Sequence, residues 1–140
     1  MSAHPVFDKH HGAWEGTYTL MDRSGRILDT HQSRLECRIE GDTWLQKNIY
    51  TWADGRSETK EFTGAFTPTG LIFDTPRLKG SAHEADARVI TLRWTYTHEP
   101  GNEYAEVITL ISDTHRARTW QHFEQGEFTK LTVIDERKVS

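Results

Sequence analysis

The sequence lacks the features that would place the protein in a membrane, in the secretory pathway or on nucleic acid. No apolar run approaches the roughly 20 residues of a membrane span, and the amino-terminal residues lack the charged-then-apolar pattern of a secretory signal. Acidic and basic residues are mixed along the chain, with a net charge of −4 at pH 7, so no clustered basic surface is expected. The single cysteine, Cys37, excludes an internal disulfide. We therefore expect a cytoplasmic protein without nucleic-acid or membrane partners, in which Cys37 is a small buried residue.

Motifs for phosphate binding and for serine hydrolysis are also missing. The chain contains no Gly-x-Gly-x-x-Gly, no Gly-Lys-Ser/Thr loop and no Gly-x-Ser-x-Gly. Its eight histidines include no His-x-His pair, and the adjacent His10 and His11 would point to opposite sides of a strand. We expect no cofactor and no metal site. A metal ion held by scattered histidines and carboxylates, or a haem with one axial histidine, stays open as an alternative.

The stretch from Thr43 to Asp54 alternates with a period of two, as β-strands do. Large aromatic side chains and amides share one face. Such a face is typical of the wall of a small-molecule pocket, because a plain core would avoid amides that need hydrogen-bond partners. The alternative is an amphipathic strand whose polar face is simply in water. The residues on the aromatic face are Trp44, Gln46, Asn48, Tyr50 and Trp52.

Alternation of this kind recurs along most of the chain, and no segment has a convincing helical period. Residues 4–11 are long enough only for one helical turn, with Pro5 near its start. Turn sequences such as Asp54-Gly55 and Glu99-Pro-Gly-Asn102 separate the strands. The expected strands cover residues 13–22, 32–40, 43–54, 58–66, 71–74, 77–83, 87–98, 104–112, 115–124 and 128–137.

About ten short strands joined by tight turns predict an all-β fold. A meander of twisted strands is stabilised by closing on itself, because closure removes both exposed edges. We therefore expect one domain over residues 1–140: a single antiparallel up-and-down barrel of about eight to ten strands, wide enough for one small ligand. A two-sheet sandwich is the alternative.

Phe7-Asp8 followed by Gly12-Ala13-Trp14 resembles the amino-terminal signature of the lipocalin and fatty-acid-binding (calycin) barrels. The resemblance implies that the Gly-x-Trp lies at the closed end of the barrel and that a basic residue from the last strands packs over the indole. Arg137 is the residue expected there, with Arg116 as the alternative. The family's Thr-Asp-Tyr-type loop motif and structural disulfide are absent, so the chain is most similar to cytoplasmic bacterial lipocalin-like proteins.

The predicted pocket combines aromatic, amide and ionisable side chains. On the strand 115–124, either Arg118, Trp120 and His122 or Thr119, Gln121 and Phe123 face inward; we favour the first set. Glu106 joins them if Tyr104 and Ile108 also face inward. The expected ligand-binding residues are Tyr18, Gln46, Asn48, Trp52, Phe62, Phe73, Trp94, Tyr96 and Trp120, with Ser33 beside them.

Two function classes follow from such a pocket. In the first, the protein is a cofactor-independent isomerase, lyase or cyclase acting on an aromatic or polyketide-like carbonyl compound. His122 or His31 would be the general base, and Tyr50 or Arg118 would stabilise the developing oxyanion. In the second, it is a passive carrier or sensor for the same kind of ligand; a structural or adaptor role comes third. A homodimer is left open.

Overall fold

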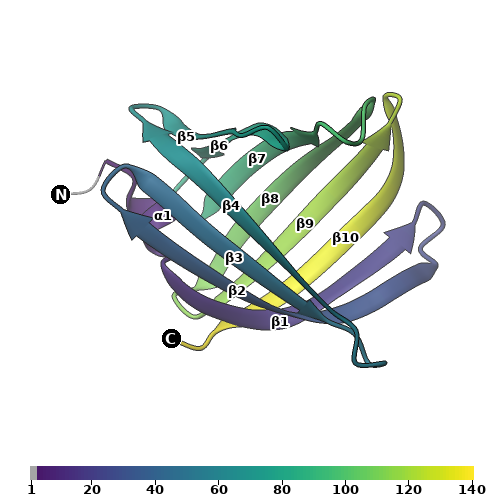
Figure 1. Ribbon diagram of the computed structural model, residues 1–140. Coiled ribbons are helices and arrows are strands. Elements are labelled where there is room, and N and C mark those ends of the chain that lie inside the picture. Colours follow the sequence, from purple (N-terminus) through teal and green to yellow (C-terminus); the bar gives the residue numbers. More distant parts are fainter. Residues whose placement is uncertain (1–2) are drawn as a thin grey trace.

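The alternation of apolar and polar residues becomes the inside and the outside of a closed sheet. The computed structural model describes residues 3–140, and ten strands and one helical turn make up its regular structure (Figure 1). In chain order these are α1 (Pro5–Asp8), β1 (Gly12–Asp22), β2 (Ile27–Glu40), β3 (Thr43–Thr51), β4 (Ser57–Thr67), β5 (Gly70–Asp74), β6 (Leu78–Glu84), β7 (Val89–Tyr96), β8 (Asn102–Ser112), β9 (His115–Glu124) and β10 (Glu127–Lys138).

Each strand pairs antiparallel with its neighbours in the sequence, and β10 pairs with β1 to close the barrel. The predicted up-and-down barrel with a short helical turn is therefore confirmed, and the sandwich is wrong. The strand bounds differ from the prediction mainly at β2, which begins at Ile27 and so adds Asp29 to the barrel wall beside His31, which was already expected on the inner face. Cys37 is buried on the inner face of this strand, as expected.

The backbones of β1 and β10 approach one another closely at Gly16. Gly16 is opposite Glu136 in the register of the two strands, and a Cβ at this position would overlap the carbonyl oxygen of Asp135. The strands can close the barrel here because glycine has no side chain.

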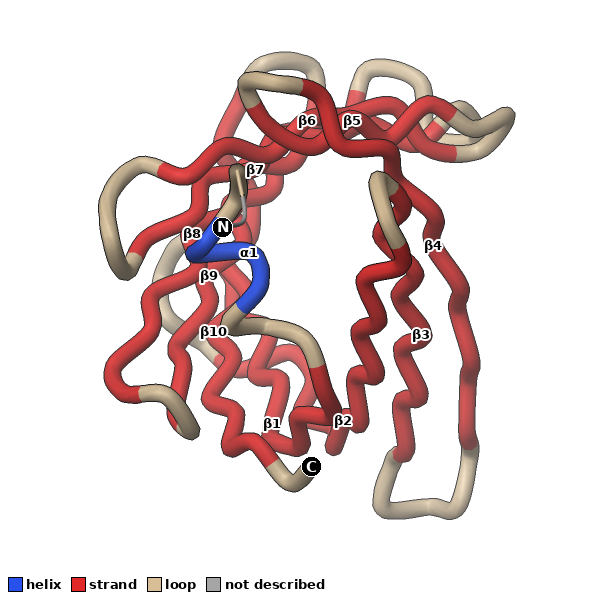
Figure 2. Tube along the Cα trace, turned by 90° about the vertical axis from the view of Figure 1, so that its left-hand side faces the viewer, coloured by secondary structure: helices blue, strands red, loops and turns tan. Residues whose placement is uncertain are grey.

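The helical turn α1 lies at one end of the barrel (Figure 2). Apolar side chains fill this end. The Phe7 ring packs edge-on against Trp44, with centroids 5.8 Å apart, and against Phe66 at 5.4 Å. The backbone N–H groups of Val6 and Phe7 both donate to Oε2 of Glu84, at 2.8 and 3.0 Å. Because Glu84 belongs to β6, this carboxylate fixes α1 to the barrel wall, and α1 covers this end.

Arg116, not Arg137, packs over Trp14. The Arg116 guanidinium carbon lies 4.3 Å from the indole centroid, whereas Arg137 is exposed. The parity of β10 explains the difference, because Glu136 points inward and its neighbour Arg137 must then point outward. Arg116 also donates to Glu136 Oε1 at 2.7 Å and contacts Nδ1 of His10 at 2.8 Å.

Candidate functional site

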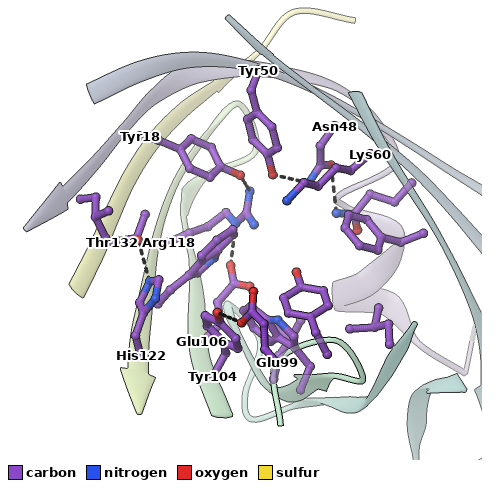
Figure 3. A pocket seen from close by; sticks show the side chains of 18 of the residues that line it. Tyr18, Asn48, Tyr50, Lys60, Glu99, Tyr104, Glu106, Arg118, His122 and Thr132 are labelled. Atoms are coloured by element: carbon purple, nitrogen blue, oxygen red, sulfur yellow. Dashed lines mark hydrogen bonds and ion pairs between the residues drawn. The ribbon is translucent and has the colours of Figure 1, made fainter. Parts of the chain in front are cut away.

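The half of the barrel away from α1 encloses a cavity of about 250 Å³ (Figure 3). Its deep wall includes the buried Tyr18 and Tyr50. Glu58 and Trp52 line it near the strand ends opposite α1, and Glu58 is exposed. The cavity therefore opens at the end of the barrel that α1 does not cover.

A one-directional chain of hydrogen bonds runs along the inner face of β3. The Trp44 indole, which can only donate, donates to Gln46 Oε1 at 3.0 Å. This fixes the orientation of the Gln46 amide, which donates to Asn48 Oδ1 at 3.0 Å, and Asn48 Nδ2 then donates to the Tyr50 hydroxyl at 2.8 Å. The Tyr50 oxygen is thus an acceptor within the chain, and its own proton is left for another acceptor.

Four buried charges of alternating sign lie along β8, β9 and β10. Arg118 Nε donates to Glu106 Oε2 at 2.6 Å, and its Nη1 lies 3.2 and 3.3 Å from the Glu136 oxygens. Glu136 also accepts from Arg116, so two cations and two anions balance. Burial acts to lower the pKa of Arg118, but the Glu106 and Glu136 carboxylates hold it well above its ordinary value. Within the buried set the carboxylates and guanidinium groups therefore compensate one another.

The hydroxyls of Tyr18 and Tyr50 lie at the cavity end of this network. Arg118 Nη1 donates to the Tyr18 hydroxyl at 3.1 Å, and the two tyrosine rings are 5.2 Å apart in an edge-to-face arrangement. Burial raises the pKa of both phenols above the ordinary value of 10.0, so both carry their protons at neutral pH. The Tyr18 hydroxyl accepts a hydrogen bond from Arg118, and the Tyr50 hydroxyl accepts one from Asn48. Only one of the two tyrosine hydroxyls can donate its proton to the other. At least one phenolic proton is therefore directed elsewhere.

His31 is held beside these tyrosines by Asp29. Its Nδ1 lies 2.8 Å from Asp29 Oδ2, and the Trp52 indole donates to the same carboxylate at 3.0 and 3.1 Å. Burial acts to raise the pKa of Asp29, but the hydrogen bonds from His31 and Trp52 outweigh it and lower the pKa. The His31 ring stacks on Tyr18 with centroids 5.0 Å apart and meets Tyr50 edge-on at 5.2 Å. With Nδ1 donating to Asp29, Nε2 of His31 is the proton-accepting nitrogen, and within residues 3–140 it has no hydrogen-bond partner.

His122 lies on β9, which β1 and β10 separate from β2, in a different environment from His31. Its Nε2 is 2.9 Å from Thr132 Oγ1, and its ring meets that of Tyr104 edge-on at 4.9 Å. Burial, with the nearby Lys130, lowers the pKa of His122 to about 4. The imidazole is therefore neutral at pH 7 and a weak base. Beside it, the Tyr104 hydroxyl donates to Glu99 Oε1 at 2.5 Å.

The sequence matches, over residues 4–140, the amino-terminal domain of unknown function described as DUF3598. The chain belongs to the DUF3598 family. No curated protein matches it. Within residues 3–140, this DUF3598 chain has no helix of the length and apolar character that a membrane span needs. The same residues contain no group of three or more His, Cys, Asp or Glu side chains placed to hold a metal ion.

Several solved structures share the architecture of this DUF3598 chain. A DUF3598 protein of unknown function from Nostoc punctiforme has a TM-score of 0.78 at 18% identity, over 99% of this chain and 49% of that chain. The present chain thus spans about half the length of that relative. An S-type phycobiliprotein lyase from Guillardia theta has a TM-score of 0.78 at 12% identity, over 100% and 94% of the two chains. A redesigned β barrel bound to DFHBI has a TM-score of 0.52 at 18% identity, over 95% and 99%. At these identities the likeness establishes the fold.

All thirteen residues that the sequence analysis assigned to catalysis or ligand binding line the cavity of the DUF3598 chain, and their roles stay predictions. On β9, Arg118, Trp120 and His122 face inward, and Glu106 joins them from β8. Two other expectations about the cavity lining are wrong. Trp44 packs in the core beneath α1, and Ser33 is buried outside the cavity lining. The thirteen residues are Tyr18, His31, Gln46, Asn48, Tyr50, Trp52, Phe62, Phe73, Trp94, Tyr96, Arg118, Trp120 and His122.

Sequence reasoning missed several polar lining residues of the DUF3598 chain. Asp29 lies two residues before His31, and Lys60 lies two residues before Phe62. Extending the period of two by one step in each strand therefore predicts that both point inward. Glu99 lies just beyond β7, next to a proline-glycine turn, where alternation gives no information. Tyr104 is part of β8, whose sequence is apolar on both faces, so its inner face could not be assigned from the sequence.

Proposed function

We propose that the barrel binds a small aromatic carbonyl compound and moves a proton at the carbon next to the carbonyl group. The observation that carries this proposal is the spare phenolic proton of the Tyr18–Tyr50 pair, next to the accepting nitrogen of His31. A donor and a base on neighbouring strands suit a substrate that loses a proton from carbon while negative charge develops on oxygen.

The proposed reaction is an enolisation. His31 Nε2 takes the proton from the α-carbon. The electron pair of the broken C–H bond forms the C=C bond of the enolate, and the π pair of the carbonyl bond moves onto the carbonyl oxygen. The resulting enolate oxygen accepts a hydrogen bond from the tyrosine pair. Return of the proton to the same or another carbon completes an exchange or an isomerisation without a cofactor.

Arg118 acts through Tyr18 in this scheme. Its guanidinium is engaged by Glu106, Glu136 and the Tyr18 hydroxyl, so it polarises the phenol and does not contact the substrate oxygen itself. Oriented dipoles of this kind stabilise a developing oxyanion strongly where water is excluded.

His31 suits the role of base better than His122. Asp29 orients His31 and stabilises the imidazolium that forms when a proton is accepted. His122 has a lowered pKa, near 4, so protonating it in its buried site is unfavourable. We therefore assign His122 and Thr132 to ligand positioning.

The cavity size favours a ligand with one or two rings. A volume of about 250 Å³ is just below the usual range of roughly 300–1,000 Å³ for small-molecule pockets. Two structural relatives support a small-molecule role: one is a phycobiliprotein lyase, and another binds DFHBI. The lipocalin resemblance points the same way.

The test is hydrogen–deuterium exchange of 2-acetonaphthone, a two-ring ketone, followed by loss of its methyl signal in proton NMR in D2O. Binding is measured in parallel by quenching of tryptophan fluorescence. The wild type should accelerate the exchange, and His31→Gln should lose a factor of about 10² to 10⁴, the usual contribution of a general base. His83→Gln, at an exposed histidine, is the control.

The outcomes separate the two function classes. Exchange that depends on His31, with ketone binding retained in His31→Gln, supports the enzyme. Exchange lost in His122→Gln and kept in His31→Gln would reverse the assignment of the base. Binding without any exchange identifies a carrier or sensor. No detectable binding of the ketone to the wild type overturns the proposal.

A further inference from the structure

Lys60 on β4 is a basic side chain that points into the cavity (Figure 3). It is opposite Asn48 in the register of β3 and β4, so it shares the inner face with the amide that donates to Tyr50. Phe62, two residues along β4, also lines the cavity. Lys60 is half-buried, and its aliphatic part lies in the wall while its ammonium group reaches the interior.

The other basic residues of the lining have acidic partners. Arg118 is paired with Glu106 at 2.6 Å, and Arg93 lies 4.0 Å from Glu103. Lys60 forms no ion pair or hydrogen bond with any side chain in residues 3–140. Its charge is therefore not balanced by the cavity wall.

The acidic lining residues near the mouth are already engaged or exposed to water. Asp29 accepts from His31 and Trp52, and Glu99 accepts from Tyr104. Glu58 is exposed and makes no ion pair. An ammonium group held inside a partly apolar cavity without a counter-charge loses hydration, which a negatively charged ligand group would offset.

We propose that Lys60 binds a carboxylate of the ligand, so that the substrate class is an aromatic keto acid and not a neutral ketone. This inference rests on the proposed function and adds the charge of the ligand to it. The carboxylate lies against Lys60 and Asn48 on β3 and β4. The ketone end then faces Tyr18 and His31 on β1 and β2.

Three probes with the same naphthyl ketone test the charge. They are 6-acetyl-2-naphthoate, its neutral carboxamide and 2-acetonaphthone, and each dissociation constant is measured by tryptophan quenching at low and high salt. The wild type should bind the carboxylate about tenfold more tightly than the carboxamide, the usual magnitude for a charge-assisted hydrogen bond. High salt should reduce this preference.

Two variants of Lys60 and one control complete the design. Lys60→Met should abolish the preference and leave binding of 2-acetonaphthone within about twofold, while Lys60→Arg should keep it. Lys47→Met is the matched control, because Lys47 is on the neighbouring strand β3 and points outward. Circular dichroism verifies that each variant is folded.

The results distinguish this inference from the proposed function. An equal affinity for carboxylate and carboxamide in the wild type, or an unchanged preference in Lys60→Met, overturns the role of Lys60 alone if 2-acetonaphthone still binds. Failure of 2-acetonaphthone to bind overturns the proposed function, and failure of all three probes overturns the role of Lys60 with it.

Discussion

Asn48 donates its side-chain N–H to the Tyr50 hydroxyl at 2.8 Å, and the direction of this bond is set two residues earlier by Gln46. The order matters because it leaves Tyr50 as a hydrogen-bond donor toward the cavity. If the bond ran the other way, the phenolic proton would be used inside β3, and Tyr50 would offer a ligand only an acceptor.

Reversing this bond should weaken the binding of ketones. In Asn48→Asp the new carboxylate can only accept, so Tyr50 would donate to it and lose its spare proton. We expect about tenfold weaker binding of 2-acetonaphthone, as for the loss of one hydrogen bond of about 1.4 kcal/mol, measured by fluorescence quenching. Gln121→Glu makes the same chemical change at an exposed position of β9 and should have no effect. Unchanged affinity in Asn48→Asp would show that Tyr50 does not donate to the ligand.

The buried charges should respond to single and paired substitution in opposite ways. Glu106→Leu leaves Arg118 with less compensation and should cost about 3–5 kcal/mol of unfolding free energy. Adding Arg118→Met removes the positive charge that Glu106 had compensated, while Glu136 stays paired with Arg116. The double variant should therefore recover more than half of that loss. Urea denaturation of the single and double variants measures the coupling. Additive losses would show that the two side chains do not act as a pair.

Stability should fall on mild acidification. Burial lowers the pKa of His122 to about 4 and that of His10, also near Arg116, to about 2, whereas both histidines titrate near 6.5 in the unfolded chain. Between pH 6.5 and 5 the unfolded chain therefore binds protons that the folded chain does not, and the free energy of unfolding decreases as the pH falls. Each group adds up to about 1.4 kcal/mol per pH unit to this slope.

His122→Asn should remove its part of that slope, and His83→Asn, at an exposed position, should not. Urea denaturation of the wild type and both variants at several pH values between 5 and 7.5 provides the comparison. An unfolding free energy of the wild type that stays constant over this range would contradict the neutral, buried state of both imidazoles.

Two glycines should be sensitive to alanine for different reasons. At Gly16 the new Cβ would meet the backbone of Asp135, so Gly16→Ala should cost about 1–3 kcal/mol, as overpacking does. At Gly55 nothing lies within 4 Å and the strain arises only from φ of +90°, so Gly55→Ala should cost about 1–2 kcal/mol. Thermal and urea unfolding measure both. A shift of the β1–β10 register, seen in amide NMR, is expected only for Gly16→Ala.

The barrel was predictable because most strands are polar on one face and apolar on the other. Over residues 43–54 the period of two places Asn48, Tyr50 and Trp52 on one side without ambiguity, and the structure places all three at the cavity. In β8 both faces are apolar, so alternation could not reveal that Glu106 points inward. Its inward direction is explained by Arg118 on β9, a partner that only the three-dimensional structure identifies.

The choice between Arg137 and Arg116 failed for a related reason. The expectation that charges lie outside gives no signal for Glu136, which is fully buried. Because successive side chains of β10 point to opposite faces, an inward Glu136 requires that Arg137 point outward. Arg116 on β9 then packs over Trp14. Pairing between strands, and not the pattern within one strand, therefore decides where the buried charges lie.

Because Glu84 fixes α1 over one end of the barrel, the cavity opens toward the other end, beside Trp52 and Glu58. A ligand that enters or leaves at this end would pass the same two side chains. The cavity of about 250 Å³ holds one small ligand. A bound product would therefore have to leave before another substrate molecule could bind. Any turnover would then show competitive inhibition by its own product.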